Sequence, residues 1–125
     1  MLKIRRVALE SLLEGSRNVF PNEFLALLRG EKNGEDFVIT EILLAPLSEY
    51  LPGSAYFNDL MVPTDPTIVG TFHSHPSRGP PRPSPADLHL FGRRGAVHLI
   101  SSLPYSEETT AAFDFNGRKI VYEII

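Results

Sequence analysis

The chain has 125 residues, of which 42% are hydrophobic and 22% are charged, and its formal net charge is −3. This length predicts one domain, residues 1–125, with enough chain to bury a core, and the composition argues against disorder. The pI of about 5.8 argues against a basic surface that binds nucleic acid. The sequence has no long apolar stretch, so we expect neither a secretory signal nor a membrane span. Cysteine is absent, which excludes thiolate zinc ligands and cysteine nucleophiles and favours a reducing, cytoplasmic compartment.

The N-terminal half predicts one helix followed by strands. Leucines recur at helical spacing among polar residues over about residues 5–19, which predicts an amphipathic helix. Two apolar runs, at residues 23–28 and 37–44, flank the turn-like residues 32–35, and this pattern predicts a β-hairpin. We expect a further extended segment at residues 54–61.

The C-terminal half predicts strands on either side of a short helix. Residues 67–72 are β-branched and apolar, so they read as a strand, and residues 84–91 begin with a Ser-Pro pair that is typical of a helix start. Residues 96–100 predict a strand buried on both faces, and residues 109–125 predict a closing hairpin around Asn-Gly at 116–117. Together these elements predict an α+β fold of α/β/α type, with a mixed, curved sheet packed by two to three helices.

The residues most suggestive of chemistry are His73 and His75, which are followed by Pro76. Two histidines two residues apart on an extended segment point to the same face. Because proline cannot donate within a ladder, we expect both histidines at the end of the strand. Asp87 follows in the first turn of the predicted helix. Two imidazoles and a carboxylate, leaving one position for water, are the ligand set of a catalytic zinc site rather than a structural one.

Each neighbouring polar residue also has a purely structural interpretation. Asp87 could be a partner of the helix dipole, and Ser84 could be only an N-cap. Glu23 could be a solvated acid, although it directly precedes an apolar run, where a carboxylate is costly without a partner. His98 lies within an apolar strand and is expected to be a buried core histidine or one that supports the metal ligands, not a ligand itself, whereas His89 is expected at the surface.

Several other classes that use a histidine pair can be set aside. Metallo-β-lactamases need Asp and His soon after the pair, but residues 76–79 are Pro-Ser-Arg-Gly. Amidohydrolase barrels need a far longer chain. Zinc deaminases need paired cysteines, and this chain has none.

Glu23, the His-Ser-His-Pro run at 73–76, and Ser84 with Asp87 three residues later together resemble the JAMM motif, also called MPN+. This family of zinc isopeptidases includes proteasome-lid and endosomal deubiquitinases and small archaeal relatives. The resemblance covers nearly the whole chain, and the archaeal single-domain members are the most similar in pattern. It implies the MPN/JAMM fold, which is similar to that of cytidine deaminases.

The resemblance implies a role for each residue of the motif. His73, His75 and Asp87 would hold one Zn²⁺ per chain, with water in the fourth place. Glu23 would act as general base, and Ser84 would donate a hydrogen bond to the oxyanion. The implied reaction is hydrolysis after the C-terminal Gly-Gly of ubiquitin-like modifiers.

Two other functions stay open at this point. One is the trimming of a sulfur-carrier protein that ends in Gly-Gly. The other is a non-catalytic MPN scaffold, although such scaffolds characteristically lose ligands. The partners implied are ubiquitin-like or sulfur-carrier proteins, with no nucleic acid and no membrane, and analogy to the family favours a homodimer.

Two departures from the family pattern concern substrate contacts. Seven residues, 77–83, separate the proline from Ser84 where the family usually has six, so we expect the extra residue to loop out within residues 78–82. The chain also has little room for the insertions that grip polyubiquitin. Asn58 is a candidate for bonding the backbone of a substrate tail, or a turn residue. Arg78 is a candidate for meeting an acidic partner, or a solvated arginine.

Overall fold

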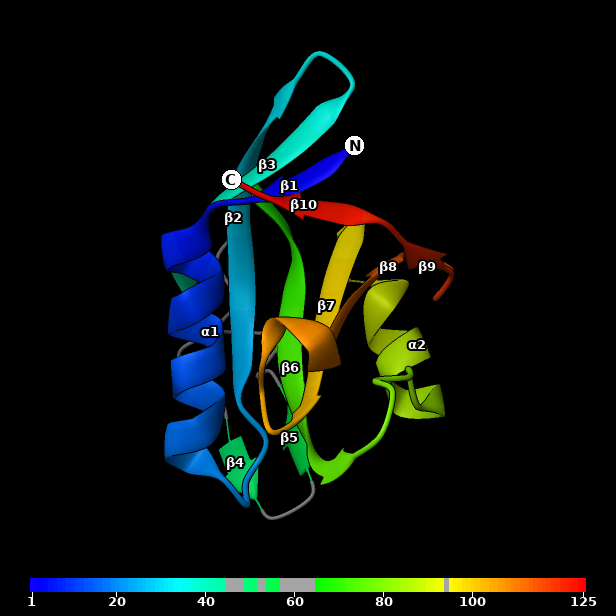
Figure 1. Cartoon of the computed structure of the whole chain (residues 1–125). Helices are drawn as coiled ribbons and strands as arrows, with labels where there is room; N and C mark the ends of the chain where they lie inside the picture. The colour runs from blue at the N-terminus through cyan, green and yellow to red at the C-terminus, as the bar shows by residue number, and fades with distance from the viewer. Residues whose placement is uncertain (45–48, 52–53, 57–64, 94) are drawn as a thin grey trace.

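A computed structural model describes residues 1–44, 49–51, 54–56, 65–93 and 95–125. Within these residues, eight strands form one mixed sheet in the order β10-β1-β3-β2-β6-β7-β8-β9, and two short strands pair separately (Figure 1). The large sheet consists of β1 (Leu2–Ile4), β2 (Leu25–Asn33), β3 (Asp36–Leu43), β6 (Ile68–Arg78), β7 (Val97–Leu103), β8 (Thr110–Asp114), β9 (Lys119–Ile120) and β10 (Tyr122–Ile124). The small pair consists of β4 (Glu49–Leu51) and β5 (Ser54–Tyr56).

Helix α1 (Arg6–Val19) covers one face of the large sheet. Its buried side chains Ala8, Leu9, Leu12, Leu13 and Ser16 form a single stripe. This stripe packs against β2, β6 and β7 through residues such as Leu28, Phe72 and Leu99. Each fully buried leucine contributes about 1.5–3 kcal/mol relative to an exposed one, so this layer is the main core of the molecule.

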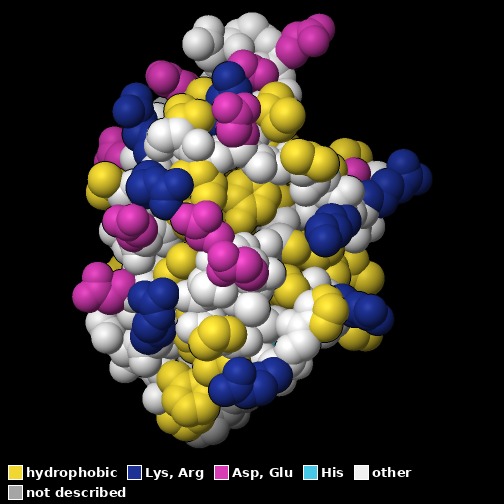
Figure 2. Space-filling model, viewed as in Figure 1, with side chains coloured by type: hydrophobic (Ala, Val, Ile, Leu, Met, Phe, Trp, Pro, Cys, Tyr) yellow, Lys and Arg dark blue, Asp and Glu magenta, His cyan; other side chains and the backbone are white. Residues whose placement is uncertain are grey.

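Helix α2 (Pro85–Phe91) lies on the opposite face of the sheet. Alternate strand residues point to opposite sides of a sheet, so adjacent residues of β7 show which helix covers each face. Phe91 packs with Ile100 of β7 and with Phe113 of β8, whereas Leu99 belongs to the α1 side. Figure 2 has the view of Figure 1, with α1 on the left and α2 on the right. Charged side chains surround an apolar area in this view and histidine is scarcely visible. The histidines of β6 belong to the α2 side: His73 has Leu25 and Ile100 as its strand neighbours, and His75 pairs with Ser102.

Most predicted elements of the N-terminal half are confirmed. The expected helix over residues 5–19 is α1, and the expected hairpin is formed by β2 and β3. Its turn is closed by the pair Asn33 and Asp36, and Gly34 takes a φ of 64°, which glycine adopts readily.

In the C-terminal half, the strand expected at 96–100 is β7, whose residues 97–102 are all buried. The other expected extended segment is described only in part. Of the segment expected at 54–61, residues 54–56 form β5 and residues 57–61 lie outside the described part.

The prediction that the histidines end their strand is wrong. β6 continues through Pro76 to Arg78, and its register against β7 shifts between His75 and Arg78. A bulge is one of the places where a strand tolerates proline, so the ladder resumes beyond it. The chain then turns at Gly79, whose φ is 108°. The irregularity therefore begins at the bulge, before the loop at 78–82 in which we expected the extra residue.

The hairpin expected at residues 109–125 is confirmed for β8 and β9, but not for the last strand, β10. β8 and β9 flank Gly117, which has a φ of 81°. β10 then leaves this hairpin and pairs in parallel with β1 at the other end of the sheet order. A single residue, Val121, separates β9 from β10, so the sheet is strongly curved and the chain joins its two edges (Figure 1).

The helices of the described part are α1, α2 and a short 3₁₀ turn, Glu107–Thr109. None of them is long and apolar enough to span a bilayer.

Candidate metal centre

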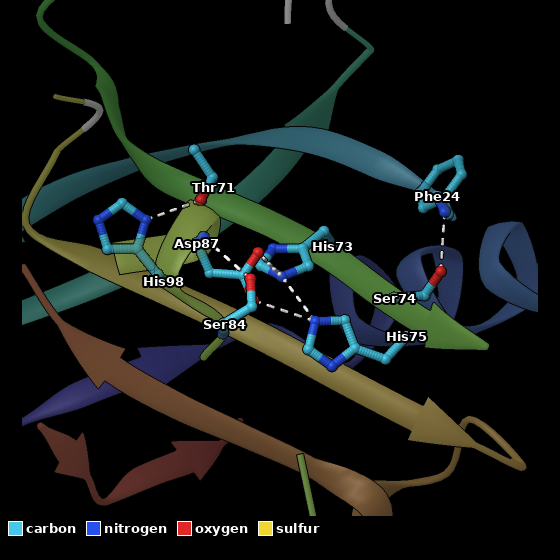
Figure 3. A network of polar contacts seen from close by, with 8 residues as sticks. All are labelled: Phe24, Thr71, His73, Ser74, His75, Ser84, Asp87 and His98. Carbon is cyan, nitrogen blue, oxygen red and sulfur yellow. Dashed lines mark hydrogen bonds and ion pairs between the residues drawn. The ribbon is translucent and has the colours of Figure 1, made fainter. Parts of the chain in front are cut away.

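The two histidines of β6 converge on one point above the sheet. Their Nε2 atoms lie 3.1 Å apart, and the rings are tilted by 49° with centroids 4.9 Å apart. His73 is almost fully buried, with 2% of its surface exposed, whereas His75 is half-buried. The pair therefore has an inner member fixed by packing and an outer member that solvent can reach (Figure 3).

Asp87 approaches this pair from the first turn of α2. One carboxylate oxygen, Oδ1, lies 3.0 Å from Nε2 of His73, and the other, Oδ2, lies 3.1 Å from Nε2 of His75. Asp87 is held there by a capping box. The backbone N–H of Ser84 donates to Asp87 Oδ2 at 2.8 Å, and the N–H of Asp87 donates to Ser84 Oγ at 3.1 Å. The N-cap expected at Ser84 is thus present, and it orients the carboxylate.

The donor atoms fit a zinc ion. Tetrahedral ligands about 2.0–2.1 Å from zinc lie roughly 3.3–3.4 Å from one another. The three contacts among His73, His75 and Asp87 span 3.0–3.1 Å, so a small outward adjustment would admit the ion. These residues also form the one group of metal-ligand side chains found within the described ranges. Two imidazole nitrogens directed at each other and at one carboxylate are an arrangement that a shared cation stabilises.

The carboxylate is poised to remain ionised. Burial by itself would raise the pKa of Asp87. Hydrogen bonds with His73 and His75, the charge interaction with His73 and the hydrogen bond from the backbone N–H of Ser84 outweigh burial and hold that pKa well below its usual range. A charged carboxylate is the form that binds a metal.

Glu23 lies just before β2, which begins at Leu25, and interacts electrostatically with His75 and Asp87. Burial raises the pKa of Glu23 to about 7, with His75 opposing the shift and Asp87 adding to it. These electrostatic contacts place the carboxyl group near both ligands. With a pKa of about 7, Glu23 can exchange a proton near neutral pH. A bound cation would lower this pKa and favour the ionised form that acts as a base.

Ser74, which lies between the two histidines, is hydrogen-bonded to Phe24, the residue after Glu23. It points to the α1 side of the sheet and is fully buried. Its side-chain oxygen accepts a hydrogen bond from the N–H of Phe24 at 2.7 Å, and its own N–H donates to Phe24 O at 2.9 Å (Figure 3). Tyr105 completes this side, because its hydroxyl donates to the backbone carbonyl of His75 at 3.2 Å.

Sequence reasoning did not assign roles to Ser74 or Tyr105. The serine lies inside the histidine motif, and its spacing to Glu23 carries no local pattern. Tyr105 comes from a loop after β7 and reaches His75 only through tertiary folding, so no sequence signal announces it.

The remaining candidates fall outside the metal centre. Arg78 is exposed at the end of β6, and His89 is exposed on α2, as expected. Asn58 lies outside the described residues. His98 is fully buried, as expected, and it is not among the converging donor atoms. A surface hollow of about 390 Å³ lies along β8, β9 and β10, and none of the predicted site residues lines it.

The curved sheet between helices and the His-His-Asp centre together define a protein of the JAMM/MPN class. The family described as "Prokaryotic homologs of the JAB domain" matches residues 5–116. A protein of Haloferax volcanii named "Probable metalloprotease" is 41% identical over 116 residues, which cover 88% of this chain and 71% of that protein. This chain belongs to the family of prokaryotic JAB-domain homologues.

Solved structures agree with this assignment. The chain matches a structure described as "JAMM: A Metalloprotease-like Zinc Site in the Proteasome and Signalosome" with a TM-score of 0.76 and 32% identity, over 100% of this chain and 98% of that one. A JAB1/MPN domain protein from Archaeoglobus fulgidus gives a TM-score of 0.75 at 31% identity, over 100% and 97%. A protein from Desulfitobacterium hafniense, 22% identical, shares the fold with a TM-score of 0.70, over 100% and 93%. The predicted fold class is confirmed.

Proposed function

We propose that this protein is a zinc-dependent metalloprotease that hydrolyses the bond after the C-terminal Gly-Gly of ubiquitin-like modifiers. The observation that carries the proposal is the triangle of donor atoms from His73, His75 and Asp87, with the carboxyl group of Glu23 beside it. The family and the relative named as a metalloprotease support the hydrolytic class. The chain is thus an enzyme of the JAMM type with zinc as its cofactor.

Each residue has a separate task in this scheme. His73, His75 and Asp87 hold the ion. When bound, zinc would polarise the scissile carbonyl and bring the pKa of water towards about 7. Glu23 takes the proton from the attacking water and delivers it to the departing amine. Glu23 is suited to both steps because it is half-buried and coupled to the ligands without being held in the capping box.

Ser84 can serve the reaction while it caps α2. Its Oγ accepts the hydrogen bond from the N–H of Asp87, and its own hydroxyl hydrogen remains available for donation. A donor of this kind, aimed at the developing oxyanion, is worth about 10²–10³ in rate.

The substrate class rests on the family and on the openness of the outer ligand. A solved relative, 32% identical, represents a metalloprotease-like zinc site in the proteasome and signalosome. The half-buried His75 and the exposed turn at Gly79 leave one side of the centre accessible. A Gly-Gly tail has no side chains, so its backbone can approach such a centre closely.

Cleavage of defined conjugates tests the proposal. The zinc-loaded protein is offered a ubiquitin-like modifier joined through Gly-Gly either to a lysine side chain or to a linear peptide, and also a sulfur carrier with one extra C-terminal residue. We expect cleavage after Gly-Gly that a zinc chelator stops and that added zinc restores, and no cleavage by Glu23→Gln. Cleavage of the sulfur carrier alone would identify the trimming enzyme instead. Absence of both zinc and cleavage would indicate a non-catalytic scaffold.

The proposal extends to where and how the enzyme works. A homodimer and a cytoplasmic location are the states expected for this family and for a chain without cysteine. Sedimentation of the zinc-loaded protein and fractionation of cells would test them.

A further inference from the structure

We propose that Thr71, Phe91 and His98 form a buried support that positions the metal ligands His73 and Asp87. This inference rests on the proposed function, because it assigns these three residues to the holding of the same ion. None of the three is in the group of donor atoms that could hold the ion, so they are positioning residues rather than catalytic ones.

His98 is fixed by hydrogen bonds on both ring nitrogens. Nε2 lies 3.2 Å from the carbonyl oxygen of Gly95, and Nδ1 lies 2.7 Å from the hydroxyl of Thr71 (Figure 3). A carbonyl can only accept, so Nε2 carries the hydrogen and Nδ1 accepts from the Thr71 hydroxyl. Both Thr71 and His98 are fully buried. The imidazole therefore has one orientation, set by β6 on one side and by the turn before β7 on the other.

Phe91 links α2 to the fixed imidazole of His98. Its ring stacks on His98 with centroids 4.1 Å apart and an angle of 8° between the planes. Phe91 is also the only buried residue of α2, every residue of which is described. A helix of seven residues is not stable by itself, so its position depends on this contact at one end and on the Ser84 cap at the other.

Asp87 and Phe91 lie four residues apart, so they share one face of the helix. The position of the Phe91 ring on His98 therefore sets the position and rotation of α2, and with them the place where the Asp87 carboxylate meets the histidines. Leu90, which faces a separate cluster with Leu25 and Leu27, does not make this connection.

Phe91 also steadies the buried ligand. Its ring packs against that of His73 with centroids 6.3 Å apart. Metal-binding histidines usually donate their second ring N–H to a carbonyl or carboxylate. The Nδ1 of His73 is buried and has no hydrogen-bond partner among the described residues. The orientation of His73 thus depends on packing, and Phe91 supplies part of it.

Two substitutions at Thr71 separate hydrogen bonding from packing. Thr71→Val keeps the volume but removes the hydroxyl that His98 needs, whereas Thr71→Ser loses a methyl group but keeps the hydroxyl. Phe91→Leu removes the stacked ring in a second, independent way. Leu12→Ala, in α1 on the other face of the sheet, serves as a control that lowers stability without touching the support.

The measurements are zinc affinity, by competition with a chelator, and the visible spectrum of the cobalt-substituted protein, which reports ligand geometry. We expect Thr71→Val and Phe91→Leu to weaken zinc binding by about ten-fold, the low end for residues that orient ligands, and to alter the cobalt spectrum. Thr71→Ser and Leu12→Ala should stay within about two-fold of wild type, as distant or conservative changes do, even where their melting temperatures fall.

The outcomes distinguish this inference from the proposed function. If wild type binds zinc and cleaves conjugates while Thr71→Val and Phe91→Leu bind zinc with unchanged affinity and spectrum, the support is only structural and this inference is overturned. The same holds if Leu12→Ala weakens zinc binding as much as Phe91→Leu does. If wild type itself binds no zinc, the proposed function is wrong and the inference falls with it.

Discussion

Ser74 and Phe24 are joined by two hydrogen bonds, one in each direction, across the neighbouring strands β6 and β2. The Ser74 N–H donates to Phe24 O at 2.9 Å, and the Phe24 N–H donates to Ser74 Oγ at 2.7 Å. Ser74 lies between the two metal ligands and Phe24 directly follows Glu23. In the proposed mechanism this clamp holds the segment that carries the general base Glu23 against the strand that carries His73 and His75.

Removing the clamp oxygen should slow turnover more than it weakens zinc binding. Ser74→Ala removes the oxygen that accepts a hydrogen bond from the buried Phe24 N–H, which costs about 1–3 kcal/mol and lets the segment that carries Glu23 shift. We expect a lower kcat, with KM and zinc content close to wild type. Ser16→Ala is the matched control, because Ser16 is also a fully buried serine but bonds within α1. Equal loss of kcat in both variants would mean that the effect is general destabilisation.

Glu23→Gln should keep the metal and lose hydrolysis. The amide has almost the shape of the carboxyl group but cannot accept the proton of an attacking water. General acid–base groups contribute a factor of about 10²–10⁴ in rate, so kcat should fall by at least about 10²-fold. The zinc stoichiometry should stay at one per chain. Loss of zinc together with activity would show that Glu23 is a ligand or a structural support.

Ser84→Asp separates the two roles of this serine. Aspartate is a good N-cap, so the helix that carries Asp87 should remain as stable as in wild type, whereas Ser84→Ala should lose about 0.5–2 kcal/mol. An anion beside the developing oxyanion should nevertheless reduce kcat strongly. Melting temperature, zinc content and kcat measured on both variants test this. Wild-type turnover in a zinc-loaded Ser84→Asp protein would leave Ser84 as a cap alone.

In the metal-free protein, the buried groups His98 and Glu23 contribute to the pH dependence of stability with opposite signs between about pH 4 and 7. Burial lowers the pKa of His98 from 6.5 to about 4, so the unfolded state binds the extra proton between these values and stability falls as pH drops from 6.5 to 4. At about 1.36 kcal/mol per pKa unit, this contribution is at most about 3 kcal/mol. Burial raises the pKa of Glu23 from 4.5 to about 7, so its contribution decreases as pH rises through that window.

Glu23→Gln removes only the second contribution. We therefore expect the melting temperature of the metal-free variant to rise more steeply between pH 4.5 and 6.5 than that of metal-free wild type. Parallel curves for the two proteins would show that Glu23 is not buried enough to carry a raised pKa.

Much of the fold was accessible from local sequence signals. The leucine stripe of α1, the Gly34 turn between β2 and β3, and the Ser-Pro start of α2 are each encoded within a few neighbouring residues. The convergence of His73, His75 and Asp87 followed from strand alternation, helix capping and resemblance to a known motif. These features depend on chemistry that a short window of sequence contains.

The parts that escaped prediction depend on contacts between distant segments. β1 and β10 have three residues each and pair in parallel across almost the full chain length, so no turn connects them and no periodicity develops. Pro76 stays inside β6 because a bulge accommodates it, which depends on the neighbouring strand. Likewise, the stacking of Phe91 on His98 depends on tertiary packing that the separate sequence patterns of these two residues do not contain.

Locating the zinc ion in crystals of the zinc-loaded protein, by anomalous scattering at the zinc edge, tests the central claim most directly. We predict one peak per chain, within about 2.0–2.2 Å of Nε2 of His73, Nε2 of His75 and an oxygen of Asp87, with Glu23 beside it and not bonded to it. A peak at another site, or an Asp87 that points away from both histidines in the zinc-loaded protein, would contradict the account.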